Sequence, residues 1–349
     1  MIRITLLTGY GRFFGQTRKP WLSMDTGALI EQLGQLGIEA EEHGFHEVVN
    51  STQDLTRDVV FYTFSQRENL RLYIHDLVSA LQDSGKTVIP SYELLRCHEN
   101  KGFAQIHAQR TEISSLWSIY LSSKRELPSY QINYPVVLKT RQGSNSRGVF
   151  LIAAETELLR RIRKLERGAP LPMKLDFLRR RLLRNSKVFP HYPGLTGKQD
   201  TDAYIDYKTP EIPFILQEFV PDLKYDHRVI IFGERYYVSK RLTRKGDFRA
   251  SGAKKFTFST VPDPALLNYA REIYEKLDTP FLSLDVGTRE GGFCLFEFQA
   301  LHFGINVIVK AEGYFTARNG DWTFVKENLP VESLIARGLA TYLKKKGQA

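Results

Sequence analysis

The sequence contains only two cysteines, Cys97 and Cys294, among 349 residues. So few thiols exclude a disulfide scaffold and a zinc site built from cysteines, and they suit a reducing compartment. The sequence also lacks a long apolar run, and its first residues, MIRITLLTGYGRFFG, hold only a short one before glycines and charges. This start is typical of neither a signal peptide nor a membrane span, and we expect a cytoplasmic protein.

Familiar phosphate-binding motifs are missing as well. The segment 194–198, GLTGK, has the wrong spacing for a Walker A loop, and no protein-kinase catalytic loop occurs. The segment GYGRFFG has its last spacing one residue too long for GxGxxG, so we interpret it as a tight turn between a strand and a helix. No period of 20–50 residues repeats, which argues against a solenoid.

The composition is that of an ordinary globular protein, with 42% hydrophobic and 25% charged residues, and the length predicts two or three domains. The net charge of +10 is concentrated in one segment. Residues 160–187 hold eleven lysines and arginines but only two acids, Glu166 and Asp176, a net charge of +9. The basic character therefore belongs to this segment and not to the whole fold.

Hydrophobic periodicity predicts alternating strands and helices at the start of the chain. We expect strands at 2–7, 58–63 and 87–90, and helices at 24–37 and 68–84. This alternation predicts a small parallel sheet. Beyond it, we expect a polar helix at 102–122, a basic helical segment at 157–187 and a loop-rich return at 188–213.

The later part of the chain is predicted to form antiparallel strands. We expect strands at 134–139 and 149–152 joined by a Gly/Ser-rich loop, a strand at 214–220, a meander from 229 to 241 and a helix at 263–277. Glycines let backbone N–H groups turn inward, so the loop at 140–148 suits a polyanion, although a solvated hairpin turn explains it too.

A predicted hairpin at 281–304 brings three oxygen-bearing side chains together. Asp285 lies on its first strand, and Glu297 and Gln299 lie on its second. Alternation places Glu297 and Gln299 on one face, and Phe296 and Phe298 on the other. Carboxylate and amide oxygens suit Mg²⁺, which usually shares them with phosphates, although polar residues that merely face water give the same pattern.

Four segments in this order carry a resemblance to a known family. They read VVLKTRQGSNSRGVFLI, FILQEFVPDLKYDHRVIIFG, GDFRAS and LDVGTREGGFCLFEFQ. Together they resemble the ATP-grasp superfamily, in particular its RimK-like branch of ribosomal-protein glutamate ligases, with D-alanine–D-alanine ligase as a more distant relative. The resemblance covers about residues 101–304, and residues 1–90 fit the domain that precedes it in the family.

The resemblance implies an α/β and α+β fold with three parts. They are a Rossmann-like domain at 1–95, a central lid subdomain at 96–216 with a basic helical insertion at about 157–210, and an antiparallel-sheet subdomain with the metal site at 217–349. It also implies a set of nucleotide-binding residues. These are Lys101 and Lys139 for the phosphates, Gly143, Ser144, Ser146 and Gly148 in the lid, Gln217, Glu218, Phe219 and Val220 for adenine, Asp226 for ribose, and Lys240.

The same resemblance implies the reactive end of the site. Arg228 and Arg241 would face the γ-phosphate and an acyl-phosphate. Arg249 matches the arginine of the family's FRAN segment, here FRAS, and Lys240, Arg241 and Arg249 compete for one role. Asp285, Glu297 and Gln299 would bind Mg²⁺, or Mn²⁺ in its place. The family commonly has Asn where this chain has Gln299, whose carbonyl lies one methylene further out. His302 follows where the family has Pro-Gly, and it either lies near the acceptor site or packs in the core.

These expectations lead to an ATP-dependent ligase that joins a carboxylate to an amine or another nucleophile through an acyl-phosphate. The carboxylate would belong to a small molecule, a peptide or a glycan precursor. Two alternatives stay open: an ATP-grasp phosphotransferase, and a nucleotide-binding protein without catalysis that docks on an anionic partner.

The basic segment at 160–187 has several interpretations. It forms a solvated lid helix, binds an anionic polymer or acidic peptide, or lies on a membrane surface with Leu175, Leu178 and Leu182 toward lipid. Nucleic acid is disfavoured because the segment lacks interleaved aromatic residues.

Overall fold

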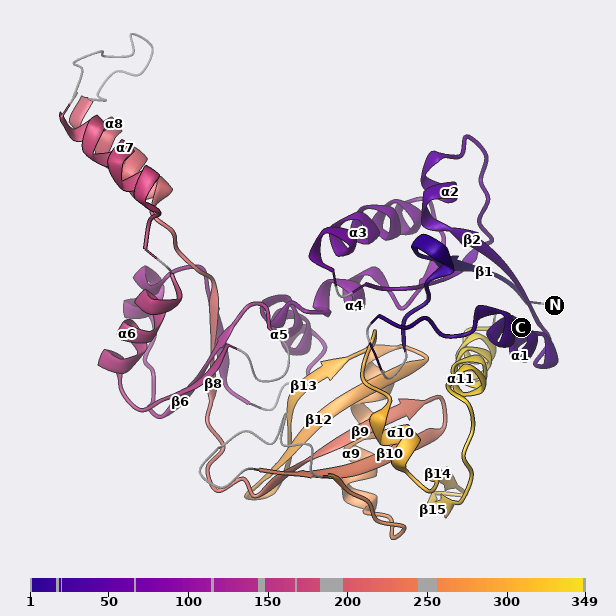
Figure 1. Ribbon diagram of the computed structural model, residues 1–349. Coiled ribbons are helices and arrows are strands. Elements are labelled where there is room, and N and C mark those ends of the chain that lie inside the picture. Colours follow the sequence, from indigo (N-terminus) through magenta and orange to yellow (C-terminus); the bar gives the residue numbers. More distant parts are fainter. Residues whose placement is uncertain are drawn as a thin grey trace. The chain divides into compact units, whose positions relative to one another are not determined.

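The computed structural model describes residues 2–16, 19, 21–65, 67–113, 116–143, 148–166, 168–182, 197–243 and 256–347 (Figure 1). The chain divides into two compact units. The first comprises Met1–Trp117, Gln142–Arg147 and Val220–Ala349, and the second comprises Ser118–Arg141 and Gly148–Phe219. The three-part division expected from the sequence stays a prediction. Within the described ranges, no helix is both long and apolar enough to cross a bilayer.

The first unit begins with a parallel sheet of four strands in the order β2-β1-β3-β4. The predicted strands are confirmed as β1 (Ile2–Thr8), β3 (Val59–Tyr62) and β4 (Thr87–Ile89), and the predicted helices as α1 (Thr26–Gln35) and α3 (Glu68–Asp83). Strand β2 (Ile38–Gly44) and the short helices α2 (Phe45–Asn50) and α4 (Tyr92–Cys97) were not predicted from the sequence. Strand β2 reads IEAEEHG, and its charged side chains suit the sheet edge that it occupies but hide the strand pattern.

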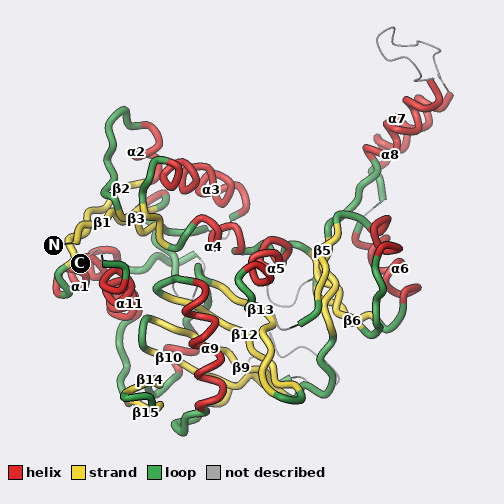
Figure 2. Tube along the Cα trace, turned by 180° about the vertical axis from the view of Figure 1, so that it is seen from behind, coloured by secondary structure: helices red, strands yellow, loops and turns green. Residues whose placement is uncertain are grey.

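The same unit contains an antiparallel sheet in the order β13-β12-β9-β10-β14-β15, with a short strand β11 (Phe256–Thr257) paired to β10. Its strands are β9 (Tyr225–Phe232), β10 (Arg235–Leu242), β12 (Phe281–Arg289), β13 (Gly292–Gln299), β14 (Tyr314–Arg318) and β15 (Asp321–Val325). Helix α9 (Pro264–Leu277) covers one face, as Figure 2 shows. Leu266, Leu267 and Ile273 of α9 pack there against Leu282 and Leu284 of β12.

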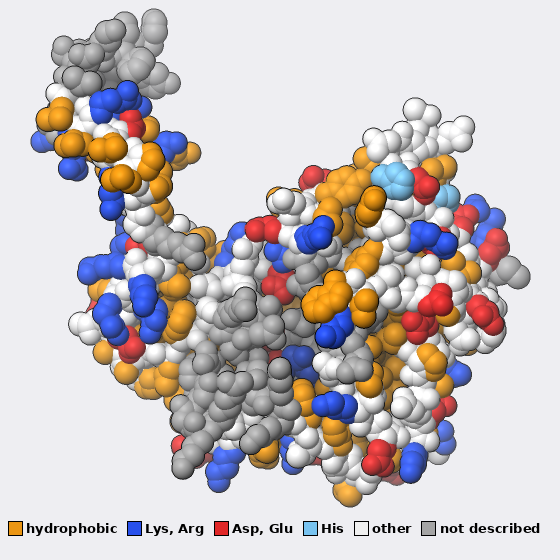
Figure 3. Space-filling view, viewed as in Figure 1, with side chains coloured by type: hydrophobic (Ala, Val, Ile, Leu, Met, Phe, Trp, Pro, Cys, Tyr) orange, Lys and Arg blue, Asp and Glu red, His pale blue; other side chains and the backbone are white. Residues whose placement is uncertain are grey.

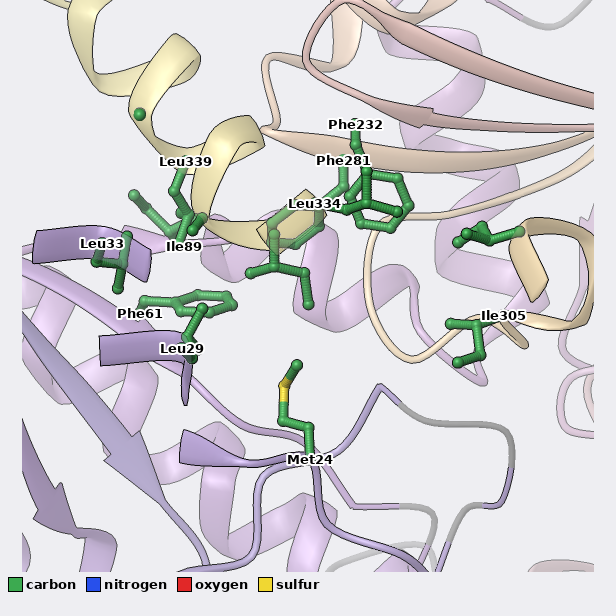
Figure 4. Packing of buried hydrophobic residues seen from close by; sticks show 14 of the residues in the cluster. Met24, Leu29, Leu33, Phe61, Ile89, Phe232, Phe281, Ile305, Leu334 and Leu339 are labelled. Atoms are coloured by element: carbon green, nitrogen blue, oxygen red, sulfur yellow. The ribbon is translucent and has the colours of Figure 1, made fainter. Parts of the chain in front are cut away.

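The parallel and antiparallel sheets of the first unit share one hydrophobic core. The rings of Phe61 on β3 and Phe281 on β12 lie 5.7 Å apart, and those of Phe281 and Phe232 lie 5.9 Å apart. Helix α11 (Val331–Lys345) adds Leu334 and Leu339 to this core, as Figure 4 shows, and the short helix α10 (Asn306–Lys310) lies beside it. Both sheets are therefore held together as one body.

The second unit is built on an antiparallel sheet in the order β5-β8-β6-β7. Its strands are β5 (Ser118–Leu121), β6 (Val136–Thr140), β7 (Val149–Ile152) and β8 (Phe214–Glu218). Helix α6 (Glu155–Leu165) covers one face, where Leu158 and Ile162 pack against Leu138 and Leu216. The helices α7 (Leu171–Leu182) and α8 (Gly197–Lys208) form a separate hairpin.

Three sequence expectations were wrong around this unit. The helix expected at 102–122 is α5 (Lys101–Arg110), and β5 begins at Ser118. The helical segment expected at 157–187 is broken between α6 and α7, where Gly168 and Pro170 interrupt the pattern. The segment 188–213, expected to be a loop-rich return, contains α8. The tyrosines and aspartates of α8 form no apolar stripe, so the sequence did not predict a helix there.

Candidate functional site

Charged side chains gather on the face of the antiparallel sheet that lies opposite α9. The register of β9 and β10 places Asp226 beside Arg241, and the register of β9 and β12 places Arg228 beside Asp285. Cross-strand partners point to the same face of a sheet, so these four side chains meet there. Three of them, Asp226, Arg241 and Asp285, are less than 8% exposed.

The four groups form one network of charge-assisted hydrogen bonds. Arg228 donates from Nε to Oδ1 of Asp285 at 2.8 Å and from Nη2 to Oδ2 at 3.0 Å. Arg241 donates from Nε and Nη2 to the two oxygens of Asp226, both at 2.6 Å, and its Nη2 lies 2.8 Å from Oδ2 of Asp285. Two guanidinium groups thus balance two carboxylates, which is the arrangement that buried charges require.

The network shifts the pKa values of its two acids in opposite directions. Burial by itself would raise the pKa of Asp285, but the charges of Arg228 and Arg241 outweigh it and hold that pKa at about 2. Burial and the nearby charge of Asp285 raise the pKa of Asp226, although Arg241 opposes the shift. Asp285 is therefore the more firmly ionised member of the pair.

Glu297 and Gln299 extend the same face onto β13. Asp285 pairs with Glu297, and Ser283 pairs with Gln299, so the three expected metal ligands share one face of the hairpin. Their oxygens are of the type that Mg²⁺ prefers. Both oxygens of Asp285 already accept hydrogen bonds from arginine. Among the described residues, no group of three or more His, Cys, Asp or Glu side chains is arranged to hold a metal.

The expected placement of Phe296 on the opposite face was wrong. The register shifts between Asp285 and Val286, where a β-bulge adds one residue to β13. A Cβ built on Gly287 would lie 2.3 Å from Cζ of Phe296, so the Phe296 ring covers Gly287 on the face that carries Asp285. Phe298 lies on the α9 side, as expected.

The expected phosphate-binding residues fall into both units. In the first unit, Lys101 begins α5, and its Nζ donates a hydrogen bond to the carbonyl oxygen of Gly143. In the second unit, Lys139 pairs with Ile215 across β6 and β8, and Gln217 pairs with Val137, which places Lys139 and Gln217 on the same face. Glu218 ends β8, one residue further along.

Two ends of the expected lid are described. Gly143 and Gly148 have φ values of 129° and 74°, where glycine is favoured. A Cβ on Gly148 would lie 2.0 Å from Oγ1 of Thr140, so a larger residue would clash. Ser144, Ser146 and Arg249 lie outside the described residues.

Two expected nucleotide-binding residues lie away from the charged network. Lys240 lines a cavity of about 240 Å³ on the α9 side with His227, Leu266 and Leu267, and its Nζ lies 4.9 Å from the centroid of the Tyr225 ring. Val220 is 8% exposed and packs with Leu116 and Cys294, so its side chain belongs to a small apolar cluster. Phe219 ends the second unit next to Glu218.

Ser239 was not predicted from the sequence as a site residue. It pairs with Arg228 across β9 and β10 and therefore lies on the charged face. Its hydroxyl is buried and has no hydrogen-bond partner among the residues that the structure describes. Such an unsatisfied donor fits a site that a ligand oxygen completes. Strict alternation with Arg241 along β10 would have revealed this residue.

A small cavity of about 30 Å³, lined mostly by apolar side chains, lies where the strands of the parallel sheet end. Gln16 follows β1, Thr63 follows β3, and His302 comes from the segment after β13. Within the described part of the chain, Oε1 of Gln16 and Nδ1 of His302 are buried without a hydrogen-bond partner. Burial lowers the pKa of His302 to about 4, so its imidazole is neutral at pH 7.

Comparison with known proteins shows the fold. No protein-family model matches the sequence, and no curated protein sequence does. Among solved structures, a RimK domain ATP-grasp protein from Sphaerobacter thermophilus aligns over 95% of this chain and 98% of its own, with a TM-score of 0.51 and 14% identity. The chain has an ATP-grasp fold. This result confirms the fold that was predicted from the sequence.

Other ATP-grasp proteins give the same result. D-alanine–D-alanine ligase from Bacillus anthracis, solved with ATP, aligns over 99% of both chains with a TM-score of 0.51 and 11% identity. N5-carboxyaminoimidazole synthetase from Staphylococcus aureus, solved with ADP, aligns over 97% of this chain and 77% of its own, with a TM-score of 0.51 and 10% identity. The similarity extends over both units of the chain, and it is a similarity of fold.

Proposed function

We propose that the protein is an ATP-dependent ligase that joins a carboxylate to an amine or another nucleophile through an acyl-phosphate. The observation that carries this proposal is the charged face of the antiparallel sheet. There, two arginines lie beside Asp285, Glu297 and Gln299 in an ATP-grasp fold. Cations for a phosphoryl group and oxygens for its metal ion are the two requirements of phosphoryl transfer.

The nucleotide roles that the family resemblance implies stay predictions. Lys101 and Lys139 would bind the phosphates of the nucleotide, Gly143 and Gly148 would belong to the lid, and residues 217–220 would meet adenine. The ribose role expected for Asp226 stays a prediction. Because both oxygens of Asp226 accept hydrogen bonds from Arg241, we assign Asp226 the further task of orienting that guanidinium.

The reaction would proceed in two steps. An oxygen of the substrate carboxylate attacks the γ-phosphorus, the bond to the bridging oxygen breaks, and ADP leaves. The amine nitrogen then attacks the acyl carbon, inorganic phosphate leaves with the electron pair, and the amine loses a proton. Arg228 and Arg241 would stabilise the phosphoryl oxygens in both steps, because a guanidinium binds such oxygens with two parallel hydrogen bonds.

The donor set on β12 and β13 fits a hard divalent cation. Glu297 and Gln299 would hold Mg²⁺, and Asp285 would join them where an arginine gives up one of its oxygens. The ion would supply charge neutralisation for the phosphate oxygens. The buried, unpartnered hydroxyl of Ser239 on the same face supports a site that a ligand completes.

The acceptor would bind at the cavity that His302 and Gln16 line. No described residue hydrogen-bonds their buried Nδ1 and Oε1 atoms, and a polar substrate group would supply such a partner. The neutral imidazole of His302 accepts a hydrogen bond at Nδ1 only if its proton lies on Nε2, and it then suits the N–H of an amine.

The test is ADP release in the presence of Mg²⁺ and panels of amino acids, peptides and glycan precursors. Hydroxylamine traps an acyl-phosphate as a hydroxamate, whereas a phosphotransferase product does not react in this way. Glu297→Ala should abolish carboxylate-dependent ADP release, and Glu290→Ala, an exposed acid on the same hairpin, should leave it unchanged. ADP release with no hydroxamate from any carboxylate would contradict the ligase proposal.

A further inference from the structure

Helix α7 exposes an apolar stripe. Leu171, Leu175, Leu178 and Leu182 are 70%, 57%, 54% and 74% exposed. Their spacing of four, three and four residues places them in one row along the helix. A helix in a globular protein normally turns such a row toward a core. Figure 3 shows the hydrophobic and basic side chains gathered on this hairpin.

Basic residues flank the stripe on both sides. At about 100° per residue, Arg179 lies on one side of the leucine row, and Lys174 and Arg181 lie on the other. All three are exposed. The helix carries four basic residues and one acid, Asp176, for a net charge of +3. An apolar row between two rows of long basic side chains is the pattern of a helix that lies at an interface between water and lipid.

Helix α8 packs on the opposite side of α7 and does not cover the leucines. The Tyr204 hydroxyl of α8 donates a hydrogen bond to Oδ2 of Asp176 at 2.8 Å, and the Arg180 guanidinium lies 3.6 Å from the centroid of the Tyr204 ring. Arg179 and Arg180 also pair with Asp176. The only acid of α7 is therefore neutralised within the hairpin, and the exposed surface is left apolar and positive.

We propose that the α7–α8 hairpin docks the protein on an anionic lipid surface. The leucine row would enter the boundary between headgroups and acyl chains, and Lys174, Arg179 and Arg181 would contact anionic headgroups. At 12 residues, α7 is about 18 Å long, which suits a helix that lies flat on the surface.

Charge complementarity selects this partner over a second copy of the chain. Two copies that paired their leucine rows would bring the basic flanks of one against those of the other, and like charges repel. An anionic surface attracts both flanks at once. Because the apolar row is only four leucines long, we expect neither apolar contact nor electrostatic attraction to suffice alone. Binding should therefore depend both on salt concentration and on the leucine side chains.

Vesicle sedimentation of the full chain tests the proposal. The protein should sediment with vesicles of phosphatidylcholine and phosphatidylglycerol in a 70:30 ratio (about one third anionic) and not with phosphatidylcholine alone. Raising NaCl from about 0.05 to 0.5 M should weaken binding at least about tenfold. Leu175→Glu/Leu178→Glu and Lys174→Glu/Arg181→Glu should each weaken it by a similar factor. Equal binding of either double variant and the wild type would overturn the proposal.

Matched controls separate the leucine row of α7 and its basic flanks from the effect of the same kind of substitution elsewhere on the protein. Leu72→Glu replaces a leucine of α3 that is 63% exposed. Arg318→Glu/Lys326→Glu makes the same charge change at the end of β14 and directly after β15. Both should bind vesicles like the wild type, and all variants should keep the wild-type circular dichroism. Absence of binding to anionic vesicles at low salt would overturn the proposal. In that case, a dimer in sedimentation velocity that Leu175→Glu/Leu178→Glu dissociates would identify a second copy as the occupant.

Discussion

The substitution Asp285→Asn tests the charged network directly. In the folded protein, Arg228 and Arg241 hold the pKa of Asp285 at about 2, below the ordinary value of 3.8. That difference corresponds to about 2 kcal/mol of stability at pH 7. Because the folded pKa is depressed, this stability is present above pH 3.8 and is lost as the pH falls toward 2. At pH 3, the same two pKa values leave about 1 kcal/mol.

The measurement is urea unfolding of wild type and Asp285→Asn at pH 7, 5, 4 and 3, followed by tryptophan fluorescence. Trp322 is a buried reporter on the same sheet. The difference in unfolding free energy should be about 2 kcal/mol at pH 7 and should shrink by about 1 kcal/mol at pH 3. Asp321→Asn, at an exposed acid of β15, should show neither effect. A difference that stays constant from pH 7 to 3 would refute the role of Asp285 ionisation.

Further predictions concern packing and burial. Gly287→Ala should lower the unfolding free energy by about 1–3 kcal/mol, because the new Cβ would lie 2.3 Å from Cζ of Phe296. Gly34→Ala, in open space on α1, should raise it by about 0.5–1 kcal/mol. Equal effects of the two substitutions in urea titrations would contradict the close contact between Gly287 and Phe296 that the bulge creates. The ring protons of His302 should not titrate in NMR spectra between pH 8 and 5.5, because burial lowers its pKa to about 4, and a midpoint near 6.5 would show a hydrated site. Ile162→Ala should cost about 2–5 kcal/mol and speed amide exchange in β6 and β8 of its own unit, and unchanged exchange there would count against the packing of α6.

The parts of the fold that could be predicted from the sequence are those with a strong apolar pattern. Strand β3 is buried along its length and β1, β9 and β12 along most of theirs, and runs such as VVFY and FLSLD reveal them. Strand β2 and helix α8 escaped prediction because tertiary contacts stabilise them. β2 gains its hydrogen bonds from β1, and α8 gains its ring contacts from α7. Local sequence patterns do not record such partners.

Some features of the candidate site could be predicted from the sequence, and others could not. The order of motifs was enough to name Arg228, Arg241, Asp285, Glu297 and Gln299, and the registers place all five on one face. The sequence could not show which carboxylate each arginine pairs with, because that depends on strand register. It also could not show that Phe296 turns toward Gly287, because a single extra residue in β13 reverses the alternation there.

The pairing of Arg241 with two acids bears on how the proposed site would accept its ligand. With two carboxylates and two guanidinium groups, the network is neutral by itself. A phosphoryl group that takes the hydrogen bonds of both Arg228 and Arg241 leaves Asp285 with an unpaired charge in a buried place, which is costly. A divalent cation beside Glu297 would remove that cost by binding the released oxygen. The proposed site therefore favours arrival of phosphate and cation together, because either one alone leaves a buried charge without a partner.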